Sequence, residues 1–152
     1  MATFEIYDEL IEPLYQALRE DTRFEGVNLI YDRMGDEPPI SKMPLIQIFL
    51  ETPWEDASRG SGSYTFQTRR LYVRIGIATF VCDSRSEADL DRHLFHIVGN
   101  LLDFIWEKRN WRTGVYVRGD QSISWDVAYG RTAQGGMVGA HRLSVQFEMF
   151  NG

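Results

Sequence analysis

Apolar and polar residues alternate most regularly over residues 69–81. Every second residue there is apolar or β-branched, which is the period of a β-strand with one buried face. The side chains expected on that face are Leu71, Val73, Ile75, Ile77, Thr79 and Val81. A mostly apolar run at residues 45–50 predicts a strand just before it. Together the two runs predict an antiparallel β-hairpin.

A different period follows, with apolar residues three or four apart over residues 87–108, and it predicts a long α-helix. Its central apolar band consists of Leu90, Leu94, Ile97, Val98, Leu101, Phe104 and Ile105. Phe95, Leu102 and Trp106 widen the apolar arc to roughly 200°, whereas about 100° suffices to cover a sheet. The surplus predicts a further contact, made either by the first helix or by a neighbouring subunit.

Two local signals concern where helices begin and bend. Ser86, with Asp89 three residues later, resembles a capping box at the start of the long helix. Residues 4–18 also carry a helical apolar stripe, and Pro13 lies inside it. We expect a kink at this proline, because the stripe continues through it; the alternative is that the regular helix begins near Pro13.

The remaining β-prone segments are residues 27–31, 122–129 and 141–150, and glycine-rich residues 130–140 predict a turn between the last two. In the last segment the side chains expected to face inward are Leu143, Val145, Phe147 and Met149. The order of helix, strands, hairpin, long helix and hairpin predicts an α+β fold. We expect a twisted antiparallel sheet with helices packed on one face, forming a single domain over residues 1–152.

The first hairpin has an unusually long connection. Residues 52–68, TPWEDASRGSGSYTFQT, are rich in Ser, Thr and Gly and have no steady apolar period. We therefore expect a long β-hairpin arm. Because such a loop loses conformational freedom only when it docks, it suits assembly better than chemistry.

Composition limits the classes of function. A net charge of −6 argues against binding a nucleic acid over a large surface, which requires many Lys and Arg contacts to phosphates. No apolar run approaches the roughly 18 residues of a membrane span, and the acidic start MATFEIYDEL lacks the basic region of a signal peptide. Cys82 is the only cysteine, so we expect no disulfide within the chain and a reduced, intracellular site of synthesis.

Candidate chemical groups are sparse. His93 and His96 lie three apart on the long helix, where plain surface residues are more common than metal ligands. His141 is expected to cap a strand or lie on the surface, and Cys82 to be a buried or half-buried structural thiol. No phosphate-binding loop is present, since RGSGSY lacks the motif's GK[ST] and a following helix. We expect no enzyme activity, no cofactor and no bound metal.

The whole layout resembles the tail terminator (tail completion) proteins of long-tailed bacteriophages, the lambda-like group. The resemblance covers nearly the whole chain and rests on its order of elements. Its most distinct stretches are RRLYVRIGIATFV, SEADLDRHLFHIVGNLLDFIWE and RLSVQFEMF. The proline in the first helix and the long segment 32–43 are departures from a plain version of this layout.

The resemblance implies a hexameric ring that caps the tail tube, stops its polymerisation and presents a surface for joining the head. The implied partners are further copies of the chain, the tail tube protein and a head–tail connector or neck protein. DNA would only pass through the lumen, and no membrane is involved. The implied location is the virion tail, after assembly in the host cytoplasm.

A closed ring needs two different patches on each subunit, and the wide helix arc and the arm are candidates for them. The interface candidates are Trp54, Arg59, Tyr64, Phe66 and Trp106. Core packing is the alternative for Trp106, and a local cluster at the base of the arm is the alternative for Trp54 and Phe66.

Three other functions remain open. The chain could be a different phage neck component, such as a stopper or adaptor. It could be a small-ligand binding module that uses the concave side of the sheet, or an enzyme that uses His93, His96 or His141. Mass in solution separates a ring from a monomer, and alanine at the histidines separates an assembly protein from an enzyme.

Overall fold

The computed structural model describes residues 5–31, 38–56, 69–83, 85–107, 115–117, 123–131 and 136–151. Within these ranges, the side chains of residues 52–56, 69–70, 115–117, 123–126 and 150–151 lie outside the description. The statements below concern the described part of the chain.

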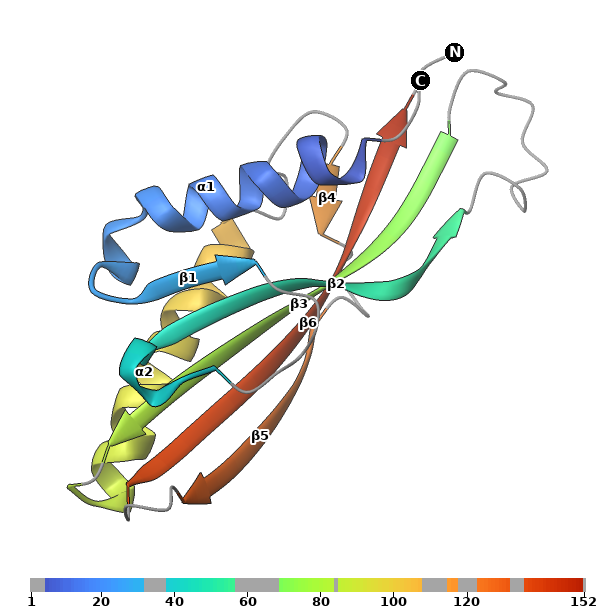
Figure 1. Ribbon diagram of the computed structural model, residues 1–152. Helices are drawn as coiled ribbons and strands as arrows, with labels where there is room; N and C mark the ends of the chain where they lie inside the picture. Colours follow the sequence, from blue (N-terminus) through green and yellow to red (C-terminus); the bar gives the residue numbers. More distant parts are fainter. Residues whose placement is uncertain are drawn as a thin grey trace.

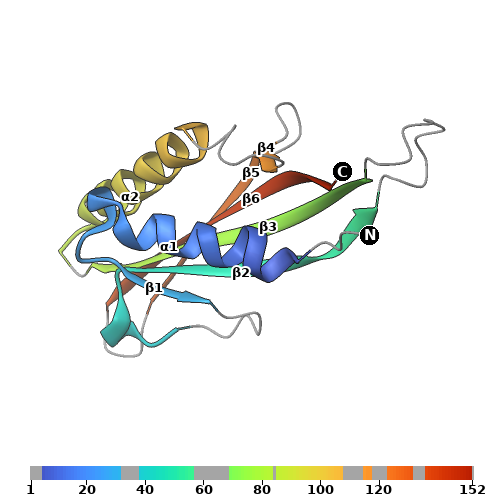
Figure 2. The ribbon, with the colours of Figure 1, turned by 90° about the horizontal axis from the view of Figure 1, so that it is seen from above.

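Six strands form one mixed sheet (Figure 1). They are β1 (Asn28–Tyr31), β2 (Leu45–Asp56), β3 (Arg69–Asp83), β4 (Val115–Val117), β5 (Ile123–Arg131) and β6 (Met137–Asn151). The order across the sheet is β1-β2-β3-β6-β4, and β5 pairs with β6 beyond β4 along the same edge. Helices α1 (Glu12–Glu20) and α2 (Glu87–Glu107) lie on one face of the sheet (Figure 2), so the predicted α+β fold is confirmed.

The pairing of β1 differs from the prediction of a wholly antiparallel sheet. β1 runs parallel to β2, with Asn28 beside Leu45 and Tyr31 beside Ile48. A parallel pair needs a connection of about a dozen residues to bring the chain back to the starting side. Residues 32–44 supply this connection. The long segment 32–43 noted in the sequence therefore serves to join two parallel strands. It includes the short 3-10 turn η3 (Ile40–Lys42), on the face opposite the helices (Figure 2).

The first helix continues through Pro13 but changes its geometry there. A π-helical turn, η1 (Tyr7–Ile11), leads directly into α1, and Pro13 lies in the first turn of α1. A proline inside a helix removes one backbone donor and crowds the preceding turn, and the widened turn lies directly before Pro13. The regular α-helix therefore begins at Glu12, as the alternative predicted, and the irregularity is a widened turn.

The helix α2 matches its prediction closely. The hydroxyl of Ser86 accepts a hydrogen bond from the Asp89 N–H at 3.0 Å and donates one to the Asp89 carboxylate at 2.8 Å. The first bond is that of a capping box. The second differs from the usual reciprocal bond, in which the acidic side chain binds the backbone of the cap residue. All seven residues of the predicted apolar band of α2 are buried.

One hydrophobic cluster joins the helices to the sheet. The sheet contributes alternate residues of β3 and β6, and every residue predicted to face inward on these strands is buried. Leu10, Leu14 and Leu18 add the apolar stripe of the first helix. At the end of α1, the turn η2 (Thr22–Phe24) packs its Phe24 ring edge-on against Phe104 of α2, with ring centroids 6.0 Å apart.

The two hairpins differ from their predictions in extent. β2 and β3 pair antiparallel, but residues 57–68 lie outside the description, so the long arm is not confirmed. β5 and β6 extend far into the predicted glycine-rich turn 130–140. Gly139 lies in β6 beneath α2, and a Cβ there would approach the Leu94 side chain to 3.1 Å. This glycine therefore allows close packing between helix and strand rather than a turn.

Candidate functional site

Most of the predicted interface residues fall outside the described side chains. Trp54 lies in the last part of β2, where only the backbone is described. Arg59, Tyr64 and Phe66 lie between β2 and β3 in residues 57–68. The structure therefore does not test whether these four residues come together, and Trp106 is the one candidate whose surroundings it describes.

Trp106 lies on a flank of α2 whose large apolar side chains are exposed. Its side chain is 66% exposed, which excludes the alternative of core packing, and Phe95 on the same flank is 44% exposed. At 100° per residue, these two side chains lie within about 20° of each other on the helix. The turn η2 packs against the opposite flank, through Phe104. The first helix is therefore not what meets the surplus apolar surface in the described part of the chain.

This flank of α2 faces strand β5. The hydroxyl of Tyr129 on β5 donates a hydrogen bond to Asp91, which lies about 40° from Phe95 around the helix. The exposed large apolar side chains in the described residues are Tyr7, Ile40, Phe95, Trp106 and Tyr129. Three of these five therefore lie on α2 and β5, at one side of the molecule. We call this region the α2–β5 surface.

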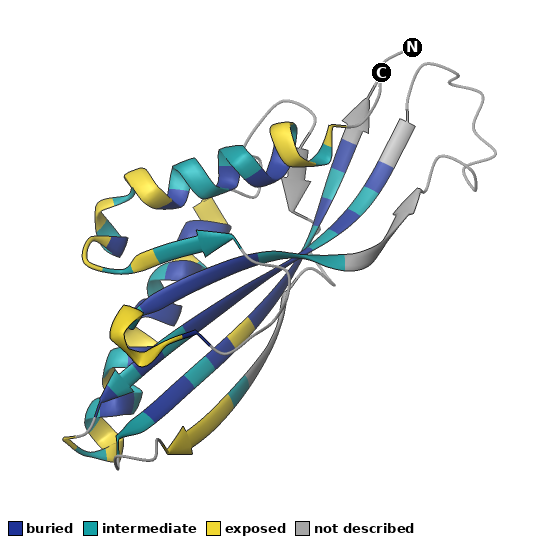
Figure 3. Ribbon diagram, in the orientation of Figure 1, coloured by how far each residue is buried: buried dark blue, intermediate teal, exposed yellow. Residues whose placement is uncertain are grey.

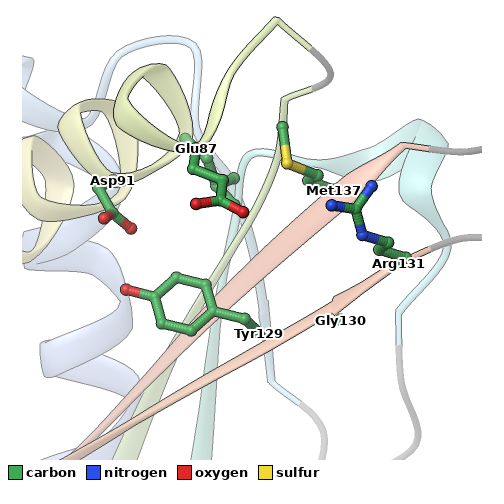
Figure 4. A pocket seen from close by; sticks show the side chains of 7 residues that line it. Glu87, Asp91, Tyr129, Gly130, Arg131 and Met137 are labelled. Carbon is green, nitrogen blue, oxygen red and sulfur yellow. The ribbon is translucent and has the colours of Figure 1, made fainter.

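A pocket of about 400 Å³ lies between the start of α2 and the end of β5 (Figure 4). It is lined by Glu87, Leu90, Asp91, Tyr129, Gly130, Arg131 and Met137. The side chains of Asp91 and Tyr129 point toward each other, and the carboxylate of Glu87 lies beside them (Figure 4). The lining thus combines two carboxylates one helical turn apart and an aromatic ring with one guanidinium, that of Arg131.

The electrostatics of the pocket centre on Asp91. Its hydrogen bond from Tyr129 raises the pKa of Tyr129 above its ordinary value, with smaller contributions from burial and from the negative charge of Asp91. The Oδ1 atom of Asp91 is buried and has no hydrogen-bond partner among the described groups. The carboxylate thus keeps one unused acceptor, which a cation or another donor can satisfy.

The other face of the sheet is also hollowed at the end of β5. A second pocket, of about 480 Å³, is lined by Pro38, Pro39, Ile40, Phe80, Ala128, Tyr129, Gly130, Arg131, Val138 and Ala140. Both pockets share the stretch Tyr129–Arg131. The end of β5 is therefore open on both faces and exposed, in contrast to the buried central strands (Figure 3).

The histidines give no support for a catalytic or metal site. His93 and His96 border a shallow surface hollow with Arg85, Asp89 and Arg92. No group of three or more His, Cys, Asp or Glu side chains within the described ranges could hold a metal ion. Cys82 is half-buried, as predicted.

The prediction that His141 caps a strand or lies on the surface is wrong. Only 3% of His141 is exposed, and it pairs with Thr79 in the middle of the sheet. The reason is that β6 begins at Met137, four residues before the predicted start, so His141 is an internal residue of the strand.

Sequence reasoning missed the pocket at Asp91 and Tyr129. In the sequence, Tyr129 is one of the alternating residues of the β-prone segment 122–129, and Asp91 lies about 40° from Phe95 on a helical wheel. The available signal was therefore an acidic residue on the long helix, Asp91, and an aromatic residue on a late strand, Tyr129. Their contact depends on how α2 crosses β5 and β6, which neither pattern specifies.

No protein-family model matches the chain, and a search of curated proteins found no relative for it. Within the described residues, no helix combines the length and the apolar character needed to cross a lipid bilayer.

Proposed function

We propose that this chain is a structural assembly protein of a bacteriophage tail, which forms a ring on the tail tube, stops its polymerisation and provides the surface for head joining. The observation that carries the proposal is the exposed apolar flank of α2 that carries Phe95 and Trp106; the start of this helix lies beside the exposed end of β5. Large apolar side chains that stay exposed on one flank of a folded chain favour a site of protein association. The order of elements adds the resemblance to tail terminators.

The fold provides the asymmetry that a ring requires. In a ring of identical subunits, each subunit contacts its neighbours through two different surfaces. The start of α2 and the end of β5 lie at one end of the long sheet, where Arg131 pairs with Met137. The connection between β2 and β3 begins at the other end, where Arg69 pairs with Asn151. The two ends of the sheet are therefore built from different elements, as a head-to-tail contact needs.

Sedimentation velocity over a range of concentrations tests the ring. Six copies of 17.6 kDa give a particle of about 106 kDa, and negative-stain electron microscopy should show an annulus.

Alanine at His93, His96 and His141 tests the enzyme alternative, since an assembly protein keeps its activity when these histidines are replaced. Because His141 is buried, the pair His93→Ala and His96→Ala is the cleaner variant.

Tube assembly distinguishes a terminator from other neck components. A major tail-tube protein of a long-tailed phage is allowed to polymerise with and without the purified chain. A terminator shortens the tubes and labels one end of each. A stopper or adaptor forms a ring but leaves tube length unchanged. A chain that stays monomeric up to high concentration and binds no tube overturns the proposal.

A further inference from the structure

Four of the five exposed large apolar side chains in the described residues belong to two surfaces of different shape. Phe95 and Trp106 lie on the flank of α2, and Trp106 is the most exposed of the five at 66%. Ile40 and Tyr129 line the second pocket, between η3 and the end of β5. Apolar side chains that stand out from a helix and an apolar hollow are complementary in shape and in character.

The second pocket is large enough to hold an indole ring. Its volume of about 480 Å³ falls within the range of roughly 300–1,000 Å³ that is usual for pockets which enclose small molecules. Besides Ile40 and Tyr129, its apolar lining includes Phe80 of β3 and Val138 of β6. A Trp side chain that enters this pocket therefore removes apolar surface from water on both sides of the contact.

Trp106 cannot reach the second pocket of its own copy. The helices cover one face of the sheet, and η3 lies on the other (Figure 2). Glu87, at the start of α2, lines the first pocket together with Tyr129 and Arg131. Trp106 follows Glu87 by 19 residues, which is about 28 Å of helix at 1.5 Å per residue. A contact between Trp106 and the second pocket therefore joins two copies head to tail, and such contacts can close into a ring.

The charges around the second pocket are mainly positive in the described part of the chain. Arg131 lines this pocket as well as the first one, since it lies at the edge of the sheet. Lys42 is exposed in the turn η3. Arg142 of β6 is exposed and binds Glu51, whose side chain is only 14% exposed. The described rim of the pocket therefore favours an acidic partner.

The end of α2 that carries Trp106 is acidic in the described part of the chain. Asp103 lies one helical turn before Trp106 and is exposed. Glu107 binds the guanidinium of Arg23, which a second carboxylate shares. Residues 108–109, a Lys and an Arg, lie outside the described residues. The described charges of the two surfaces are therefore opposite in sign.

Two other pockets fit the flank of α2 less well. The first pocket carries the carboxylates of Glu87 and Asp91, which would repel Asp103 of a second copy. A third pocket, of about 290 Å³, lies between α1 and β1, and none of the exposed large apolar side chains in the described residues lines it. There the Tyr15 hydroxyl donates to the Leu29 carbonyl at 3.1 Å and so caps the edge of β1.

We propose that Trp106 of one copy inserts into the second pocket of the next copy, with Asp103 bound to Arg131 at the rim. This inference rests on the proposed function, since it assigns the two halves of the contact between neighbouring subunits. The flank of α2 is the inserting surface, and the pocket between η3 and β5 is the receiving one.

Two variants that each remove one half of the contact test it in the full chain. Trp106→Ala removes the inserting side chain, and Ala128→Trp fills the pocket from an exposed position of β5. Each variant alone should self-associate at least about 30-fold more weakly in sedimentation velocity. An equimolar mixture should form a heterodimer of about 35 kDa, because each variant keeps the half that the other lacks.

Tyr7→Ala is the matched control, since it removes an exposed aromatic side chain that lies on neither surface. It should leave self-association unchanged. Circular dichroism checks that every variant is folded. A mixture of folded Trp106→Ala and Ala128→Trp proteins that stays monomeric, while the unaltered chain assembles, overturns the inference.

Charge exchange provides a second measurement that also separates the two proposals. Asp103→Arg alone should weaken self-association about tenfold, and Asp103→Arg combined with Arg131→Asp should restore most of it. If rings form, alone or on tail tubes, and none of these variants changes their assembly, this inference fails while the proposed function stands. If the unaltered chain forms no assembly in either setting, both fail together.

Discussion

The ring of Phe49 occupies the space that a side chain at position 76 would fill. Phe49 and Gly76 pair across β2 and β3, and a Cβ on Gly76 would lie 2.2 Å from the Phe49 ring. The guanidinium of Arg142 lies 5.3 Å from the centre of the same ring and donates to Glu51 at 3.0 Å. Position 76 therefore requires a glycine because the Phe49 ring lies so close to its backbone. The backbone conformation of Gly76 would not by itself require a glycine.

Gly76→Ala should lower the free energy of unfolding by about 1–3 kcal/mol, because the added methyl group displaces the Phe49 ring. Urea denaturation measures the change. In a Phe49→Ala background the same substitution should have an effect below about 0.5 kcal/mol, since the ring is then absent. An unchanged penalty in that background would contradict the assigned contact.

Gly99→Ala is the matched control for this prediction. Gly99 lies inside α2, and a Cβ there would meet no atom within 4 Å. Alanine has a higher helix propensity than glycine by up to about 1 kcal/mol, so this variant should be more stable than the unaltered chain. The two glycines thus have opposite predicted effects for reasons that their surroundings supply.

At the scale of elements, α2 shows how a local signal and a tertiary contact together fix one helix. The strand β3 ends at Asp83, and the Asp83 carboxylate accepts hydrogen bonds from the backbone and side chain of Arg85. The hydrogen bonds from the Arg85 guanidinium lower the pKa of Asp83 to about 2. Ser86 then caps the helix. At its other end, Glu107 binds Arg23 at 2.7 Å, which links α2 to the turn after α1.

Ser86→Ala should lower the free energy of unfolding by about 1 kcal/mol, because the N–H of Asp89 loses its hydrogen-bond acceptor. Thermal or urea unfolding measures this loss. Ser86→Thr keeps the hydroxyl and serves as the control, with a much smaller expected change. Equal losses in the two variants would show that the cap contributes nothing measurable.

At the scale of the whole molecule, α2 has a buried face for folding and an exposed apolar flank available for association. Phe104 is fully buried and touches Phe24, whereas Trp106, two residues later, is 66% exposed. The same helix therefore contains two large aromatic residues with different expected roles. Comparing them separates the stability of one copy from the assembly of several.

Phe104→Ala should lower the free energy of unfolding by about 3–5 kcal/mol, because it leaves a cavity in the core. Trp106→Ala should change it by less than about 0.5 kcal/mol, since the side chain is mostly in solvent. Trp106→Ala should instead weaken self-association, which sedimentation velocity measures at matched concentrations. A large loss of stability with unchanged association for Trp106→Ala would contradict its assignment to an interface.

Much of the fold could be predicted because strands and helices leave different periods in the sequence. The inward residues of β3 and β6 and the whole buried band of α2 were predicted correctly. The short strand β4 was missed because three residues are too few to show a period. The parallel β1 was missed because alternation says which face is buried but not which way the neighbouring strand runs.

The candidate site was predictable in part for the same physical reason. The helical wheel identified the surplus apolar flank with Phe95 and Trp106, but it could not show which element would cover that flank. The pocket at Asp91 and Tyr129 was missed, because it forms where two elements far apart in the sequence cross.

The sequence alone determined the inward residues of β3 and β6 and the buried band of α2, because burial there follows the local period of a strand or helix. It also determined where α2 begins, since Ser86 and Asp89 act within one turn. Only the tertiary structure decided which edges of the sheet are capped and which flank of α2 stays exposed. Those features depend on contacts such as Tyr15 with Leu29 and Tyr129 with Asp91, whose partners come from separate elements brought together by packing.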